Sequence, residues 1–105
     1  MRVVLCNCPP ADAERIARAV LDARAAACVN IVPGVRSLYW WEGAVCDEAE
    51  STLLFKTAAE RVGALRDTLR AAHPYAVPEI VVLEVDAAAS LGAYVDWVRR
   101  ESGPR

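Results

Sequence analysis

The 105 residues are 55% hydrophobic and carry a formal net charge of −2, from 12 basic and 14 acidic side chains. This length suits a single domain over residues 1–105, and the near-neutral charge leaves no basic patch that would neutralise phosphates, so we expect no nucleic acid partner. No segment approaches the roughly 20 consecutive apolar residues of a membrane helix, and the N-terminus lacks the features of a signal peptide, so we expect a cytoplasmic protein without a membrane partner.

Apolar periodicity divides the chain into seven predicted elements. In chain order these are a strand over 3–8, a helix over 11–27, strands over 28–41 and 44–56, a helix between 57 and 73, a strand over 80–85, and a short helix after Ser90. The run over 80–85 is continuously apolar, which predicts a buried strand.

Short local signals set several boundaries. Pro33-Gly34 interrupts the second strand and predicts a bend or bulge, and Glu42-Gly43 predicts the turn of a long hairpin. Thr57 and Glu60 have the spacing of a capping box, which predicts the start of the second helix. Ser90 is expected to begin the final helix.

The order of elements is that of an α+β, ferredoxin-like domain, a split βαβ (βαββαβ) arrangement. It predicts an antiparallel sheet with the first and third strands in the centre, two helices on one face, a long hairpin and a short C-terminal helix. Neighbouring residues such as Val4 and Leu5 point to opposite faces although both are apolar. Two helices cover only one face, so we expect the other to be buried in an obligate oligomer.

The segment from His73 to Ile80 reads His-Pro-Tyr-Ala-Val-Pro-Glu-Ile and joins a helix to a strand. Pro74 and Pro78 push the residues before them toward extended geometry. The junction therefore follows a restricted path, which holds His73 and Glu79 in place either for a ligand or simply to end the helix.

We expect all four cysteines to be free thiols, because the cytosol is reducing and the core can be built without disulfides. They are Cys6, Cys8, Cys28 and Cys46. Cys28 is predicted to lie in the core and Cys46 to be exposed near the hairpin turn.

The predicted topology places the end of the first strand beside the junction. Thiolate and imidazole are ligands that copper and other late transition metals prefer, so Cys6 and His73, with Glu79, form a candidate metal site. Cys8 is a further candidate because it shares a face with Cys6. The alternative is structural: a strand cysteine commonly packs as a small hydrophobe, and a histidine before proline often bonds the last helix carbonyls.

Three aromatic residues, Tyr39, Trp40 and Trp41, end the second strand. Alternation puts Trp40 on the face opposite the other two, so all three cannot enter one core. Packing between subunits is one reading, because aromatic residues are enriched at interfaces. The other is an intersubunit cleft for a small ligand, walled by these residues and Tyr75.

Several motifs, taken together and in this order, resemble the CutA family of divalent-cation tolerance proteins over nearly the whole chain. They are residues 26–31 (Ala-Ala-Cys-Val-Asn-Ile), Pro33, Ser37, Tyr39, Trp41, Gly43, Lys56-Thr57, His73-Pro74-Tyr75, Pro78-Glu79-Ile80, Tyr94 and Trp97. The resemblance implies a cytoplasmic homotrimer of ferredoxin-like subunits, associated with copper and divalent-metal tolerance and without an established catalytic reaction. It also implies kinship with the PII signalling trimers, which bind small effectors between subunits.

The resemblance also bears on the site. In relatives, the cysteine matching Cys6 and the histidine matching His73 are implicated in copper binding, whereas Ala72 stands where some relatives have a second histidine. The prediction is therefore a trimer that binds copper or another divalent metal through Cys6, His73 and Glu79.

The alternative prediction is a PII-like signalling or scaffold trimer that binds a small effector in the cleft. An enzyme is not expected. Pro9-Pro10 removes two backbone donors from the place where ferredoxin-like acyl-phosphate hydrolases hold an anion.

Overall fold

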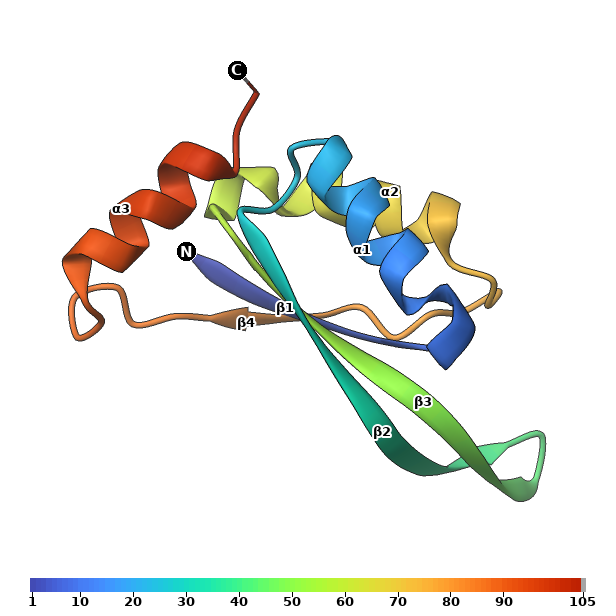
Figure 1. Ribbon diagram of the computed structural model, residues 1–105. Coiled ribbons are helices and arrows are strands. Elements are labelled where there is room, and N and C mark those ends of the chain that lie inside the picture. Colours follow the sequence, from blue (N-terminus) through green and yellow to red (C-terminus); the bar gives the residue numbers. More distant parts are fainter. Residues whose placement is uncertain (105) are drawn as a thin grey trace.

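The computed structural model describes residues 1–104, which fold into a four-stranded antiparallel sheet with three α-helices (Figure 1). In chain order the elements are β1 (Arg2–Cys8), η1 (Pro10–Asp12), α1 (Ala13–Asp22), β2 (Cys28–Trp41), β3 (Ala44–Thr57), η2 (Ala59–Arg61), α2 (Val62–Ala72), β4 (Val81–Glu84) and α3 (Gly92–Glu101). The strand order is β2-β3-β1-β4, so the first and third strands are central. This confirms the predicted ferredoxin-like arrangement.

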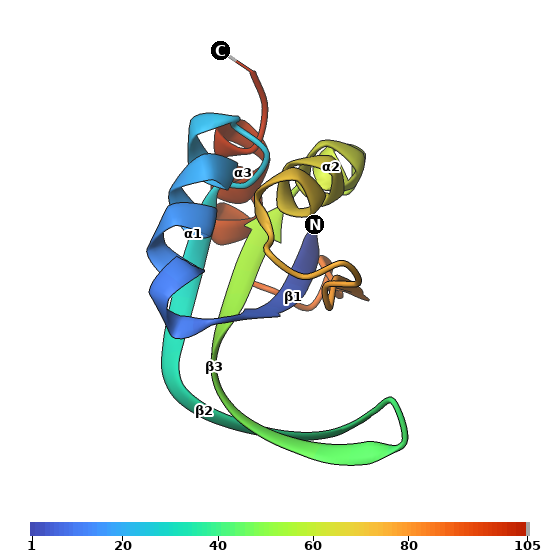
Figure 2. The same ribbon diagram turned by 90° about the vertical axis from the view of Figure 1, so that its right-hand side faces the viewer.

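The core lies between the sheet and helices α1 and α2, which run side by side on one face (Figure 2). Alternate residues of β1 and β3 point toward these helices because strand side chains alternate between faces. The main buried residues are Val4, Cys6, Cys8, Ile16, Val20, Leu53, Phe55, Leu65 and Leu69. Both β1 cysteines therefore belong to the core.

The edge strand β4 is open to solvent in a single chain. Val81, Val82 and Leu83 are 43%, 41% and 45% exposed. The prediction of a buried strand is wrong for one subunit, because β4 is the last strand of the sheet and pairs only with β1. Its apolar residues remain uncovered on both faces.

Helix α3 lies at one end of the sheet, near the N-terminus (Figure 1). Val95 and Val98 bury its inner side. Its C-terminal end is fixed by two arginines: Arg24 Nε donates to the Gly103 carbonyl at 2.9 Å, and Arg61 Nε donates to the Ser102 carbonyl at 2.9 Å. The predicted cap at Ser90 is wrong, since its hydroxyl bonds the Asp86 carbonyl and the helix begins at Gly92.

The predicted helix over residues 11–27 is shorter at both ends. A 3-10 turn precedes α1, and the helix ends at Asp22. Arg24 then adopts φ 55°, which takes the chain out of the helix, and Ala25 and Ala26 become fully buried. The alanines have a high helix propensity, but burying them at the entrance to β2 outweighs it.

The predicted capping box is also wrong. Thr57 is the last residue of β3, and its hydroxyl donates to the Ala25 carbonyl at 2.7 Å instead of capping a helix. Glu60 lies exposed in η2, so α2 starts only at Val62. The Thr57 side chain, which the local pattern predicted as a helix cap, instead bonds a residue that is distant in sequence.

The long hairpin follows its sequence signals closely. The β2–β3 register shifts between Val32 and Val35, where Gly34 has φ 73°, and the turn has φ 49° at Glu42 and 81° at Gly43. Both the bulge and the turn are confirmed. Because β1 pairs with β3 only as far as Ser51, the outer half of the hairpin is two-stranded and projects from the domain (Figure 1).

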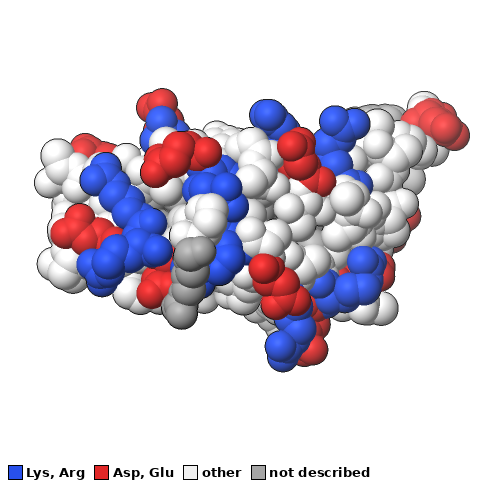
Figure 3. Space-filling view, turned by 90° about the horizontal axis from the view of Figure 1, so that it is seen from above, with Lys and Arg blue, Asp and Glu red and all other residues white. Residues whose placement is uncertain are grey.

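Charges of both signs are interspersed over the helix-covered side of the molecule (Figure 3). None of the helices within residues 1–104 is long and apolar enough to cross a membrane.

The buried bond between Thr57 and Ala25 gives a test of the fold. Thr57→Val keeps the side-chain shape but leaves the Ala25 carbonyl without its donor, so we expect a loss of about 1–3 kcal/mol in the free energy of unfolding. Urea denaturation at fixed protein concentration would measure it. Thr68→Val is the control, because Thr68 bonds only within α2 and its loss should change stability by less than about 0.5 kcal/mol. Equal losses would contradict the assigned role of Thr57.

Candidate functional site

The junction after α2 holds His73 in one orientation. Its backbone N–H still bonds the Leu69 carbonyl at 2.9 Å, but its own backbone is extended, as Pro74 predicts. The ring Nε2 lies 2.8 Å from the Asn7 carbonyl oxygen, and the Tyr75 N–H donates to Nδ1 at 3.1 Å. Since a carbonyl only accepts, Nε2 carries the hydrogen and Nδ1 is the acceptor. Both ring nitrogens are therefore engaged in a neutral imidazole.

The position of His73 has a structural cause in the sheet. The ladder between β1 and β4 stops at the pair Leu5 and Val81. Asn7 lies beyond that point, and the His73 imidazole supplies a donor to its carbonyl. The histidine thus continues the hydrogen bonding of β1 where β4 no longer reaches.

Cys6 meets His73 at the same carbonyl. The Cys6 thiol donates to the Asn7 carbonyl oxygen at 3.8 Å, which confirms the predicted closeness of the first strand and the junction. The thiol is fully buried, and its pKa is raised from 9.0 to about 12 by burial and then by the charges of Cys8, Glu79 and Glu50. At neutral pH the thiol is protonated.

The predicted metal donors are neighbours but do not form a ready-made site. Within residues 1–104, no three His, Cys, Asp or Glu side chains gather in a group that could hold a metal ion. Cys8 is buried in the core with its pKa raised by burial, then by Asp12 and Glu50, whereas Glu79 is exposed. All four cysteines are free thiols, as predicted. Metal binding by Cys6, His73 and Glu79 stays a prediction.

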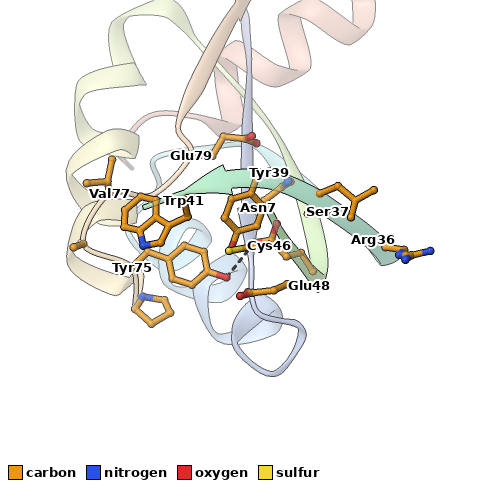
Figure 4. A pocket seen from close by; sticks show the side chains of 14 residues that line it. Asn7, Arg36, Ser37, Tyr39, Trp41, Cys46, Glu48, Tyr75, Val77 and Glu79 are labelled. Atoms are coloured by element: carbon orange, nitrogen blue, oxygen red, sulfur yellow. Dashed lines mark hydrogen bonds between the residues drawn. The ribbon is translucent and has the colours of Figure 1, made fainter. Parts of the chain in front are cut away.

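A cleft of about 880 Å³ opens between the outer half of the hairpin and the junction (Figure 4). Its lining residues are Asn7, Arg36, Ser37, Leu38, Tyr39, Trp41, Cys46, Glu48, Glu50, Pro74, Tyr75, Ala76, Val77 and Glu79. Of the predicted cleft residues, Tyr39, Trp41 and Tyr75 are present. Trp40 is absent from the lining and 75% exposed, because alternation turns it to the other side of the hairpin.

Sequence reasoning missed Glu50. Its side chain is only 6% exposed, and the Tyr75 hydroxyl donates to its carboxylate at 3.0 Å. Glu50 lies opposite Val35, beside the bulge at Pro33-Gly34, and it is buried together with the next residue, Ser51. The sequence did carry a signal for this burial, because Glu50 lies opposite the predicted Pro-Gly bulge, and a bulge redirects side chains and breaks simple alternation.

The carboxylates dominate the electrostatics of the cleft. The pKa of Tyr75 is raised by burial, by its hydrogen bond to Glu50 and by the nearby carboxylate charges. The pKa of Tyr39 is also raised, by burial and then by Glu48. Arg36, the basic residue of the lining, is held by Asp47 through bonds of 2.9 and 2.6 Å, from Nε to Oδ1 and from Nη2 to Oδ2.

The strand order β2-β3-β1-β4, with α1 and α2 on one face, defines a ferredoxin-like domain. Residues 2–101 match the family model of the CutA1 divalent ion tolerance protein. The chain belongs to this family.

Individual relatives agree with the family match. The divalent-cation tolerance protein CutA of Thermus thermophilus is 44% identical over 102 residues, covering 96% of this chain and 97% of that protein. The apo structure of the PII-like protein CutA from Nostoc superposes with a TM-score of 0.94 at 45% identity and covers 98% of each chain. Human protein CutA is 41% identical over 88 residues, which are 84% of this chain and 48% of the human protein.

The buried thiol gives a pH prediction. The pKa of Cys6 is higher in the folded protein than its ordinary value of 9.0, so the protonated thiol favours folding below pH 9, and that contribution is lost as pH rises toward about 12. We expect the free energy of unfolding to fall above pH 9 by at most about 1.4 kcal/mol per pH unit from this group.

Urea denaturation between pH 7 and 10.5 would measure the slope. Cys6→Ala should make the slope shallower, with the remainder due to Cys8 and the tyrosines whose pKa values are also raised. The Cys46→Ala control, whose side chain lines the cleft, should keep the wild-type slope. An unchanged slope in Cys6→Ala would refute the assignment.

Proposed function

We propose that this chain acts in divalent-cation tolerance as a cytoplasmic homotrimer that binds a divalent transition metal, with copper as the first candidate, through Cys6, His73 and Glu79. The observation that carries the proposal is the meeting of Cys6 Sγ and His73 Nε2 at one carbonyl oxygen, that of Asn7. Sulfur and imidazole nitrogen are the donors that copper prefers. The family match supports the divalent-cation role.

Metal binding at these residues requires two changes. Cys6 must release its proton, because the thiolate is the ligand. His73 must give up its bond to Asn7, because Nε2 carries a hydrogen while it donates. The site is therefore latent in this conformation, and binding opens the contact between β1 and the junction.

Self-association is supported by the uncovered apolar surface. β4 exposes Val81 and Leu83 on the side of the sheet away from α1 and α2, and the projecting hairpin exposes Val45 outside the cleft. Exposed apolar side chains on an uncovered sheet face are typical of an interface. The number three comes from the resemblance to the family.

A cytoplasmic location and a binding role complete the proposal. All four cysteines are free, which suits a reducing compartment. The only histidine in the chain has both ring nitrogens engaged, so the site supports binding more than proton transfer.

Copper titration tests the metal site. We expect one copper per subunit in the wild type, and binding weakened at least about tenfold in Cys6→Ser and in His73→Gln, because each removes a donor. Isothermal titration under anaerobic conditions would measure stoichiometry and affinity. Cys28→Ser is the matched control, since its thiol contacts Tyr94 of α3 instead. Unchanged copper binding in both site variants would end the proposal of this site.

Sedimentation tests the assembly. At micromolar concentration we expect a species of three times the mass of one chain. Leu83→Lys places a charge on the helix-free face and should dissociate it, whereas Ala71→Lys, on the exposed side of α2, should not. A well-folded wild-type monomer would contradict the proposed assembly.

A second candidate function is a PII-like one, in which the cleft receives a small effector. It is favoured by the cleft itself, which has the volume of a small-molecule site. Titration with copper and with a panel of small effectors that includes nucleotides separates the two roles, since each function predicts saturation by its own class of ligand.

A further inference from the structure

Acidic side chains outnumber basic ones in the lining of the cleft. Glu48, Glu50 and Glu79 line it, and the one basic residue of its lining, Arg36, is paired with Asp47. Figure 4 shows Arg36 pointing away from the aromatic side chains. The cleft therefore attracts positive charge and repels phosphates.

Glu50 is the most informative of these groups. Its side chain is more than nine-tenths buried, yet it lines the cleft. A carboxylate accepts about four hydrogen bonds, and among the described residues only the Tyr75 hydroxyl donates to it. Within residues 1–104, no Lys or Arg forms an ion pair with it. A buried carboxylate with spare acceptor capacity is a place for a cationic donor.

Aromatic rings form another part of the wall. Tyr39, Trp41 and Tyr75 gather in the same region of the cleft as Glu48 and Cys46 (Figure 4). The faces of such rings attract cations through the ring quadrupole, and Trp does so best. Trp41 is 53% exposed, so its indole is available to a ligand.

The arrangement suits an organic cation better than a metal ion. The three carboxylates do not converge as a metal requires, since no group of three candidate ligands exists in the described part of the chain. These carboxylates are spread around a cleft of about 880 Å³. A metal ion makes no use of aromatic walls, whereas an alkylammonium or guanidinium group uses both the rings and the carboxylates.

We propose that this cleft binds an organic cation, an ammonium or guanidinium group on an apolar stem, with the charge at Glu50 and the stem against Trp41 and Tyr75. This rests on the second candidate function, that the cleft is a ligand site, and is independent of copper binding by Cys6. It assigns the ligand class as cationic and excludes nucleotides. The cation can belong to a free amine or to a Lys or Arg side chain of a protein partner.

The test is isothermal titration of the full-length oligomer with spermidine, with a penta-lysine peptide and with ATP. We expect saturable binding of spermidine at one site per subunit and none of ATP. A peptide that binds at least about tenfold more tightly than spermidine would assign the cation to a protein partner, and the reverse order to a free amine.

Two pairs of variants localise the site. Glu50→Gln keeps an acceptor for Tyr75 but removes the charge and should weaken spermidine binding at least about tenfold, whereas Glu60→Gln removes an equal charge outside the cleft and should not. Trp41→Ala should weaken binding about threefold to tenfold, and Trp40→Ala, on the other side of the hairpin, should leave it unchanged. Circular dichroism and sedimentation verify that each variant folds and assembles.

Three outcomes would overturn the proposal: no saturable spermidine or peptide binding, ATP binding that competes with spermidine, or equal effects of Glu50→Gln and Glu60→Gln. A cleft filled by a neighbouring subunit would give the first. Cys6→Ser separates the two sites, because it should lower copper affinity while leaving spermidine affinity at the wild-type value.

Discussion

The structure depends on a sheet that is apolar on both faces but is covered by helices α1 and α2 on only one of them. Alternation in β1 and β3 sends one set of side chains, including Cys6 and Phe55, into the core beneath α1 and α2. The same alternation leaves the other set, and all of β4, without cover in a single chain. Burying apolar surface is worth about 25 cal/mol per Å². One pattern therefore builds the core and also leaves apolar surface for the proposed association.

The end of the β1–β4 ladder explains why His73 and Cys6 meet. A strand that stops early leaves a backbone carbonyl in need of a donor, and the imidazole of His73 fills that need at Asn7. Its structural role and the proposed ligand role would therefore compete, because Nε2 cannot donate to a carbonyl and coordinate a metal at once. The buried, protonated thiol of Cys6 adds to this competition. The proposed metal binding would therefore require a local opening of the domain.

Local signals predicted those parts of the fold that local chemistry decides. Gly34 and Gly43 adopt the positive φ values that favour glycine, so the bulge and the hairpin turn were readable from sequence. The start of α2 and the end of α1 were not, because Thr57 bonds Ala25 across 32 residues instead of capping its own helix. The approach of Cys6 to His73 followed from topology alone. The engagement of both ring nitrogens did not, since it depends on where β4 stops.

The cleft shows how one local irregularity produces a site. The bulge at Pro33-Gly34 interrupts the register opposite Ser51, and there Glu50 turns inward under Tyr75, 25 residues away in sequence. Glu50 is buried there with the Tyr75 hydroxyl as its donor and, within residues 1–104, without a Lys or Arg ion-pair partner. Its spare acceptor capacity is what the proposed cationic ligand would use. The proposed cation site therefore depends on where the bulge places Glu50, beside the open aromatic rings of the cleft.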